Sequence, residues 1–141
     1  RGITQHLPAP PDDSAKVDAI LDALGHVESG LLFANLVDFD ASYGHRRDPE
    51  GMAENIQRFD ERLPELLDAI TAEDLMIITA DHGNDPTFRG TDHTRERVPL
   101  LVIGSGEAHD LGIRESFSDV GASVAAWLRV ELGGLPGRSF V

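Results

Sequence analysis

Apolar residues along the chain follow two alternating patterns, one typical of buried strands and one of amphipathic helices. Three short runs are almost continuously apolar, as in strands that are covered on both faces. They span residues 31–37, 75–80 and 98–103, and Pro99 begins or interrupts the last of them. Because such strands alternate with helical segments, the pattern predicts an α/β fold, a mostly parallel sheet with helices on both faces.

Three other segments have apolar residues at helical spacing, and each begins beside a residue that can cap a helix. The candidate caps are, in chain order, Asp12, Asp13 or Ser14, then Asp48, and then Ser118 or Asp119. The first helix follows a stiff connector at residues 7–11 and is expected to end at Gly25. The second has Pro49 in its first turn, with a kink or restart expected at Pro64. We expect residues 1–141 to form a single domain.

Composition narrows the classes of function. The chain has 141 residues and a net charge of −13, which argues against a nucleic-acid partner because phosphates would be repelled. It has no cysteine, which excludes disulfides and thiolate metal sites and fits a reducing cytoplasm. No run approaches the roughly 20 apolar residues of a membrane span. We therefore expect a soluble, cytoplasmic protein without a membrane partner.

Side chains that bind metals follow the first two predicted strands. The candidate ligands are Asp40, His45, Asp81, His82 and His93. If the strands are parallel neighbours, these residues converge at one edge of the sheet. Carboxylates and imidazoles without sulfur suit manganese, zinc or iron rather than calcium alone. Five ligands are more than one closed zinc site needs, whereas a cluster of two ions about 3.5–4 Å apart would use them.

Each candidate ligand also has a structural interpretation. An Asp-His pair after a strand is more often a turn cap and a surface imidazole than a pair of ligands, but this one does not stand alone. Asp38 competes with Asp40, because an extended chain points both side chains the same way. Other polar residues of these loops are expected to cap turns, to orient a ligand or to hydrogen-bond locally: Asp85, Thr91, Asp92 and Thr94.

Four segments together resemble phosphopentomutase, of the alkaline phosphatase superfamily. They read DFDASYGHRRD at 38–48, TADHGNDP at 79–86, GTDHTRE at 90–96 and VPLL at 98–101. The TADHGN element alone also fits cofactor-independent phosphoglycerate mutase, whereas YGHRRD and GTDHTRE are phosphopentomutase-like. The resemblance implies an alkaline-phosphatase-like core and phosphate transfer between the C5 and C1 oxygens of ribose or deoxyribose. It also implies two divalent metal ions, with manganese favoured, and a sugar bisphosphate activator.

Carried over residue by residue, the resemblance implies that Asp40, His45 and His93 hold one metal, and Asp81 and His82 the other. It places no catalytic residue in this chain. The threonine nucleophile, a further aspartate ligand and the cap domain would belong to preceding segments. We therefore expect a carboxyl-terminal portion, incomplete at its amino-terminal side and inactive alone. Its exposed sheet edge offers a route to self-association.

Two other functions stay open from the sequence. The chain can be a complete, noncatalytic metal-binding or assembly module, or a portion of another phosphatase or phosphoglycerate mutase of the same superfamily. A reading frame upstream that encodes an aspartate-bearing strand, a threonine loop and a cap would favour the enzyme. An initiator codon directly upstream would favour the module. Substrate profiling would separate another phosphatase or phosphoglycerate mutase from a phosphopentomutase.

Overall fold

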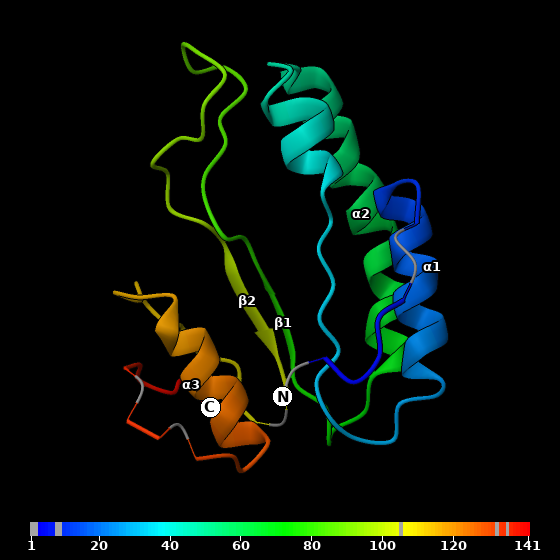
Figure 1. The fold of residues 1–141 in the computed structure, drawn as a ribbon, viewed down its shortest axis with the longest axis vertical. Helices are drawn as coiled ribbons and strands as arrows, with labels where there is room; N and C mark the ends of the chain where they lie inside the picture. The colour runs from blue at the N-terminus through cyan, green and yellow to red at the C-terminus, as the bar shows by residue number, and fades with distance from the viewer. Residues whose placement is uncertain (1–2, 8–9, 105, 132, 135) are drawn as a thin grey trace.

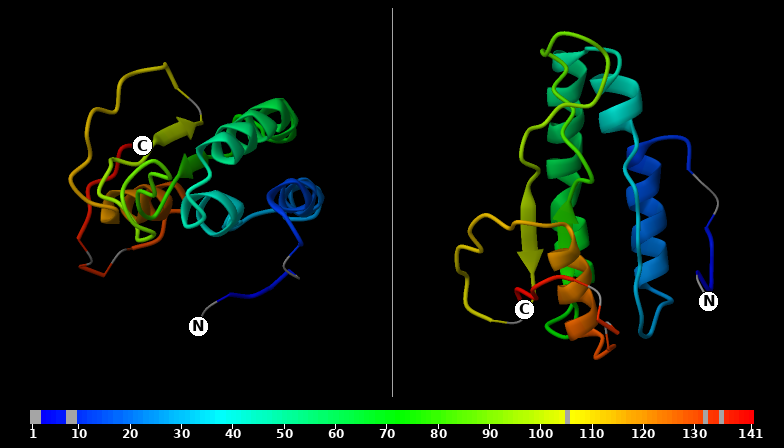
Figure 2. Two further views of the ribbon diagram at one scale, coloured as in Figure 1. Left: turned by 90° about the horizontal axis from the view of Figure 1, so that it is seen from above. Right: turned by 60° about the vertical axis from the view of Figure 1, so that its left-hand side comes forward.

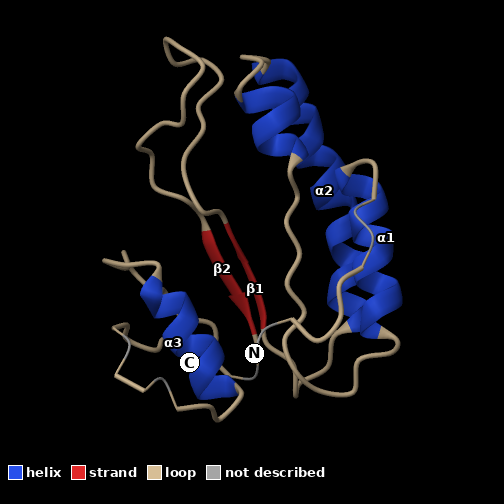
Figure 3. Cartoon of the chain, viewed as in Figure 1, coloured by secondary structure: helices blue, strands red, loops and turns tan. Residues whose placement is uncertain are grey.

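The computed structural model describes residues 3–7, 10–104, 106–131, 133–134 and 136–141. Its elements are, in order, α1 (Asp13–Leu24), the π-helix η1 (Phe39–Gly44), α2 (Pro49–Ala69), β1 (Met76–Thr79), β2 (Leu100–Ile103) and α3 (Ser118–Trp127) (Figure 1). The fold is α/β, a small sheet with helices (Figure 3). Figures 1 and 2 place α3 on one side of the strands and α1 with α2 on the other. The part of the expected connector that falls on Pro8 and Ala9 lies outside the described residues.

The sheet of the described residues consists of β1 and β2, paired antiparallel. Met76 pairs with Ile103 and Thr79 with Leu100. The expectation of a mostly parallel sheet is therefore wrong for this pair of strands. Parallel neighbours need a crossover, usually a helix, whereas residues 80–99 form a loop that turns directly back. β1 and β2 thus form the two arms of a long hairpin.

The first predicted strand, residues 31–37, is extended but pairs with no strand in the described part of the chain. A strand is defined by a neighbour that satisfies its N–H and C=O groups, and this segment has none there. Its apolar residues are consequently open to solvent, with Leu31 and Phe33 exposed to 65% and 83%. In Figure 1 the segment nevertheless runs in the same direction as β1. The residues that follow both segments therefore reach the same end of the molecule.

Helices α1 and α2 pack side by side around two buried residues, Val17 and Leu66. α1 begins as predicted, since the Asp12 carboxylate accepts a hydrogen bond from the backbone N–H of Ala15. It also ends as predicted, at Gly25. An ion pair at 2.7 Å between Arg62 of α2 and Asp18 of α1 adds a polar contact.

The predicted start of α2 is also confirmed, with the Asp48 carboxylate accepting from the N–H of Gly51 at 2.9 Å. Of the two outcomes expected at Pro64, a kink or a restart, the restart is wrong, because α2 continues through it as one helix. Proline removes a hydrogen bond there, but Arg62, which bonds to Asp18 of α1, and the buried Leu66 lie on either side of it. Within the part of the chain that the structure describes, no helix combines the length and apolar character needed to cross a bilayer.

Asp13 is a buried carboxylate that ties α1 to the chain just before the candidate site. It accepts hydrogen bonds from the backbone N–H of Asp38 and from Asn55 Nδ2 of α2, each at 3.2 Å. Its own N–H donates to the Asp38 carboxylate at 2.9 Å, and Lys16 forms an ion pair with it at 3.0 Å. The chain is therefore fixed at Asp38, two residues before the candidate ligand Asp40.

Replacing Asp13 with alanine is expected to lower the free energy of unfolding by about 2 kcal/mol, because the amide of Asn55 and the N–H of Asp38 would lose their acceptor. Asp22→Ala is the matched control in the same helix, since its side chain is 77% exposed. We expect that control to change stability by less than about 0.5 kcal/mol. Urea denaturation followed by circular dichroism measures both, and equal effects would contradict the assigned role of Asp13.

The C-terminal segment is hydrogen-bonded to two buried polar residues of α3, Asp119 and Ser123. The Asp119 carboxylate accepts from the N–H of Arg138 at 2.8 Å, and the Ser123 hydroxyl accepts from the N–H of Phe140 at 2.9 Å. The Arg138 N–H is the largest reason that the pKa of the Asp119 carboxyl is lowered, and the Arg114 guanidinium adds to the effect while burial opposes it. These contacts hold the last residues against α3.

The expected cap of α3 is wrong. The residue before the helix is Phe117, which provides no side-chain cap. The Ser116 hydroxyl accepts from the N–H of Ser118 instead, at 3.2 Å. Asp119 does not cap the helix because its carboxylate is used by the C-terminal segment. Here a tertiary contact takes precedence over a local signal.

The chain exposes far more surface than a compact monomer of its mass. Its accessible area is 10557 Å², whereas a folded monomer of 15.3 kDa is expected to expose about 7,100 Å². Large apolar side chains are among the exposed residues, including Phe33, Leu101 of β2 and Ile113. Apolar surface on this scale is typical of a face that another segment or partner covers.

Candidate metal centre

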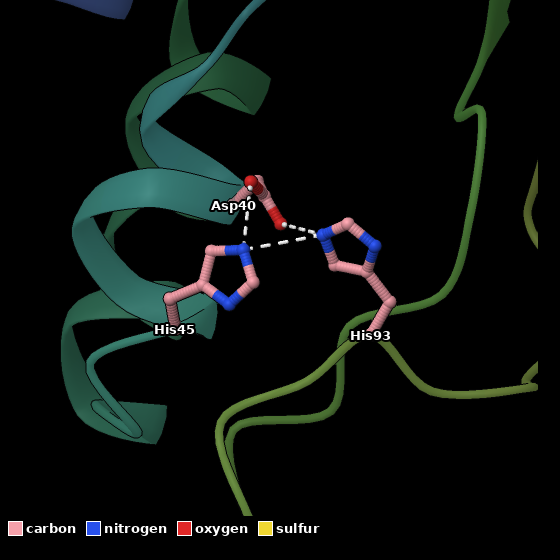
Figure 4. A group of neighbouring side chains, drawn as sticks. All are labelled: Asp40, His45 and His93. Carbon is pink, nitrogen blue, oxygen red and sulfur yellow. Dashed lines mark hydrogen bonds and ion pairs between the residues drawn. The ribbon is translucent and has the colours of Figure 1, made fainter.

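Three of the five predicted ligands come together at the end of the molecule that β1 and residues 31–37 both approach (Figure 4). Asp40 and His45 lie in and just after η1, whereas His93 lies in the loop between the two strands. His45 Nε2 is 3.4 Å from Asp40 Oδ2, and His93 Nε2 is 3.3 Å from Asp40 Oδ1. The two Nε2 atoms are 3.2 Å apart. We call these residues the Asp40–His45–His93 cluster.

The spacing in the cluster fits ligands of one metal ion. Two atoms bound to a tetrahedral ion at about 2.1 Å lie roughly 3.4 Å apart, and neighbouring atoms of an octahedron lie about 3.0 Å apart. The three measured separations, 3.2 to 3.4 Å, fall in that range. Two neutral imidazoles and one carboxylate form the nitrogen and oxygen donor set of manganese, zinc and iron sites. The cluster can therefore bind a divalent ion.

The ring of His45 is oriented for metal binding by a backbone carbonyl. Its Nδ1 contacts the carbonyl oxygen of Thr91. Because a carbonyl only accepts, Nδ1 carries the proton and Nε2 presents its lone pair towards Asp40 and His93. Histidines that ligate metals usually donate their other ring N–H to such an oxygen. Thr91 thus contributes its main chain to the site, and its hydroxyl has no part in this contact.

The loop that carries His93 is closed by two hydrogen bonds at Thr94. The N–H of Thr94 donates to the carbonyl of Gly83 at 2.9 Å, and its hydroxyl accepts from the N–H of Asp85 at 2.8 Å. The predicted use of Thr94, hydrogen bonding within the loop, is confirmed. A side chain on Gly83 would come within 2.9 Å of the Thr94 carbonyl oxygen, so the closure needs glycine there. The closure returns His93 to the end of β1.

Asp81 and His82 lie beside the cluster but do not join it. Their side chains face each other, with His82 Nε2 3.6 Å from Asp81 Oδ1, and that of Asp81 is 83% exposed. The His82 ring stacks on the ring of His93, with 3.6 Å between the centroids. His82 Nδ1 contacts the Gly83 carbonyl at 3.2 Å, which leaves Nε2 free to act as an acceptor. Among the described residues, this pair has two ligand atoms close together and no third.

Asp38 is excluded as an alternative to Asp40. Its carboxylate accepts from the N–H of Asp13 and from the hydroxyl of Ser42 at 3.2 Å. The chain curls into η1 immediately after Asp38, so the two aspartates do not point the same way as they would in an extended segment. Asp38 anchors the chain, and Asp40 faces the histidines.

Asn84 is a residue of the site that the sequence reasoning did not single out. Its amide Nδ2 donates to Asp40 Oδ1 at 2.6 Å, across from the loop after β1 to η1. The sequence did contain a signal for this residue, because its amide lies two residues after the Asp81-His82 pair. Asp85, by contrast, caps a turn as expected, because its carboxylate accepts from the hydroxyl and the N–H of Thr87. These bonds, that from the hydroxyl first, lower the pKa of the Asp85 carboxyl.

Comparisons with known proteins show the family to which the chain belongs. Residues 1–132 match the family model of the metalloenzyme superfamily. The phosphopentomutase of Agrobacterium fabrum is 48% identical over 143 residues, which cover all of this chain and 35% of that protein. The phosphopentomutase of Methylorubrum extorquens strain PA1 is 56% identical over 121 residues, which cover 84% of this chain and 30% of that protein.

A third relative, the phosphopentomutase of Clostridioides difficile, is 48% identical over 118 residues that cover 82% of this chain and 30% of that protein. The chain thus spans about a third of the length of the curated relatives it matches. Divalent metal binding, predicted from the residues, is a property of the family that the match shows. The chain belongs to the metalloenzyme superfamily, and it is homologous to phosphopentomutases over about a third of their length.

Proposed function

We propose that the chain is the metal-binding core portion of a phosphopentomutase, which moves phosphate between the C1 and C5 oxygens of ribose or deoxyribose. The Asp40–His45–His93 cluster carries this proposal, because two segments distant in sequence bring two imidazole nitrogens within 3.2 Å of each other and within 3.3 to 3.4 Å of the two oxygens of one carboxylate. The high identity to phosphopentomutases directs the choice of reaction. Manganese is the proposed ion, since it accepts mixed carboxylate and imidazole ligands.

In this proposal the chain provides one complete set of protein ligands and part of a second. Asp40, His45 and His93 hold the first ion. Asp81 and His82, which present two ligand atoms beside the first set, would hold a second ion together with groups from outside residues 1–141. Two ions about 3.5–4 Å apart stabilise the attacking and leaving oxygens of phosphoryl transfer.

Neighbouring residues hold the two histidines of the first set in position. Thr91 keeps the lone pair of His45 Nε2 directed inwards. The Gly83–Thr94 closure holds His93 opposite η1. Because the chain presents ligands and not a nucleophile, the proposed function assigns it metal positioning. The nucleophilic threonine, the substrate contacts and the sugar bisphosphate activator belong to the remainder of such an enzyme.

The exposed surface supports a role as part of a larger assembly. The accessible area exceeds that of a compact monomer by nearly half. The extended segment 31–37 pairs with no strand in the described structure and exposes Leu31 and Phe33. We propose that other segments of the enzyme cover this face, and that copies of the isolated chain self-associate through it.

Two proteins test the proposed function together. One is the isolated chain, and the other is the Agrobacterium fabrum phosphopentomutase in which the matching third is replaced by this chain. Both are assayed for interconversion of ribose 1-phosphate and ribose 5-phosphate with Mn²⁺ and a sugar bisphosphate. We expect no turnover by the isolated chain and measurable turnover by the hybrid, because only the hybrid contains a nucleophile.

A hybrid carrying His93→Ala is the control, and we expect its turnover to fall to background. Turnover by the chain alone would refute its assignment as an incomplete portion. A hybrid that folds and binds Mn²⁺ without interconverting the two phosphates would refute the mutase assignment. In that case the noncatalytic metal-binding module would be the better description.

A further inference from the structure

We propose that Asn84 is a positioning residue that fixes the Asp40 carboxylate for metal binding, and that Gly44 is required because it leaves room for the Asn84 amide. The inference rests on the proposed metal site and adds to it a residue that the ligand set does not include. Asn84 itself contacts Asp40 and lies outside the group of residues whose atoms face one another as ligands.

The hydrogen bond from Asn84 restricts the final torsion of the Asp40 side chain, which turns the carboxylate. The final torsion of aspartate is broad and roughly two-fold, so an unrestrained carboxylate would sample many orientations. Asn84 Nδ2 holds Asp40 Oδ1 at 2.6 Å, while the same oxygen is 3.3 Å from His93 Nε2. Oδ2 is then directed to His45 Nε2, at 3.4 Å. One donor thus places both oxygens relative to the two imidazoles.

The choice of an amide is chemically suited to this task. A lysine or arginine at the same place would neutralise the carboxylate and compete with the ion for it. The amide N–H is neutral, so it occupies one lone pair of Oδ1 and leaves the charge of Asp40 for the metal. The bond also connects η1 to the loop after β1, so that it joins the two segments that carry the ligands.

Gly44 supplies the space that Asn84 occupies. A Cβ at position 44 would lie 2.3 Å from Asn84 Nδ2 and 2.4 Å from its Cγ. Real Cβ atoms do not approach other atoms so closely, so the amide would have to leave Asp40. The backbone of Gly44 is in an ordinary helical region of η1, and alanine is intrinsically a better helix former than glycine. The effect of Gly44→Ala should therefore reach metal binding through Asn84.

The experiment measures Mn²⁺ affinity of the whole chain by EPR titration, together with unfolding in urea. We expect Asn84→Ala and Gly44→Ala each to weaken Mn²⁺ binding by about 10- to 100-fold, the range found when an outer partner of a ligand is removed. Thr87→Ala is the control in the same loop, because Thr87 bonds to Asp85 and not to the cluster. We expect that control to bind Mn²⁺ with unchanged affinity.

A double-mutant cycle separates positioning from general damage to the fold. In an Asp40→Ala background, Asn84→Ala should have no further effect on Mn²⁺ affinity, because the carboxylate it positions is gone. Additive losses would refute the inference, as would an Asn84→Ala affinity within twofold of the wild type. If His93→Ala also leaves the affinity unchanged, the proposed metal site itself fails. If His93→Ala weakens binding and Asn84→Ala does not, only the positioning role fails.

Discussion

Replacing His93 with alanine should weaken Mn²⁺ binding by more than a hundredfold. The Nε2 atom of His93 lies 3.2 Å from His45 Nε2 and 3.3 Å from Asp40 Oδ1, where it can share one ion with them. Its loss leaves Asp40 and His45 as the only two ligands of this cluster. Removing even an outer partner of a ligand costs about 10- to 100-fold, so loss of a direct ligand should cost more. Isothermal titration with Mn²⁺ at constant pH measures the change.

His109→Ala is the matched control, because its imidazole is exposed and, among the described residues, is hydrogen-bonded to the nearby Glu107 carbonyl and lies outside the cluster. We expect it to bind Mn²⁺ with the affinity of the unaltered chain. Thermal unfolding without metal should be nearly the same for the two variants, since the His93 side chain is 47% exposed. Equal Mn²⁺ affinity in both variants would remove His93 from the proposed site.

Among single glycine-to-alanine replacements, Gly137→Ala should lower the free energy of unfolding the most, by about 3 kcal/mol. The φ of Gly137 is 134°, a conformation that side chains disfavour. An added Cβ would lie 2.3 Å from the carbonyl oxygen of Ser118 and 3.0 Å from the Ala122 Cβ. The clash is with helix backbone, which cannot rotate away. The C-terminal segment would therefore detach from α3.

Gly121→Ala, in the helix α3 against which the C-terminal segment lies, is the control for Gly137→Ala. No atom lies within 4 Å of a Cβ at position 121, and the backbone there is helical. Alanine in an exposed helical position should keep stability unchanged or raise it by up to about 1 kcal/mol. Urea denaturation compares the two variants. A loss at Gly137 no larger than the change at Gly121 would show that the C-terminal segment is not held against α3.

Local signals in the sequence predicted the helices well. Asp12 and Asp48 both cap helices as expected, and Gly25 ends the first one. These signals depend on residues within a turn of each other, so the sequence contains all the information they need. The predicted cap of α3 was wrong because Asp119 is bonded to Arg138, 19 residues away. No pattern of neighbouring residues predicts such a contact.

The sheet was predicted less well, because pairing is a property of two segments and not of one. Residues 31–37 have the composition of a buried strand, but a strand forms only beside a neighbour that accepts its hydrogen bonds. The predicted direction of β2 was also wrong. A continuous apolar run favours a parallel sheet because it indicates burial on both faces, but it does not itself specify the direction of the neighbouring strand.

The meeting of Asp40, His45 and His93 followed from the prediction that polar residues after strand-like segments reach one end of the fold. This prediction holds although the strand pairing was predicted wrongly, because residues 31–37 still run in the direction of β1. The role of Asn84 could not be read from the sequence. It depends on the exact approach of the amide to Asp40 over the bare Gly44 backbone.

The most direct test of the proposed metal site is pulsed EPR of the chain loaded with less than one equivalent of Mn²⁺. We predict hyperfine coupling to the nitrogens of two imidazoles. That coupling should persist in His82→Ala and disappear when His45 and His93 are both replaced with alanine. Bound Mn²⁺ without nitrogen coupling, or coupling that survives the loss of His45 and His93, would contradict the assignment of the Asp40–His45–His93 cluster as a metal site.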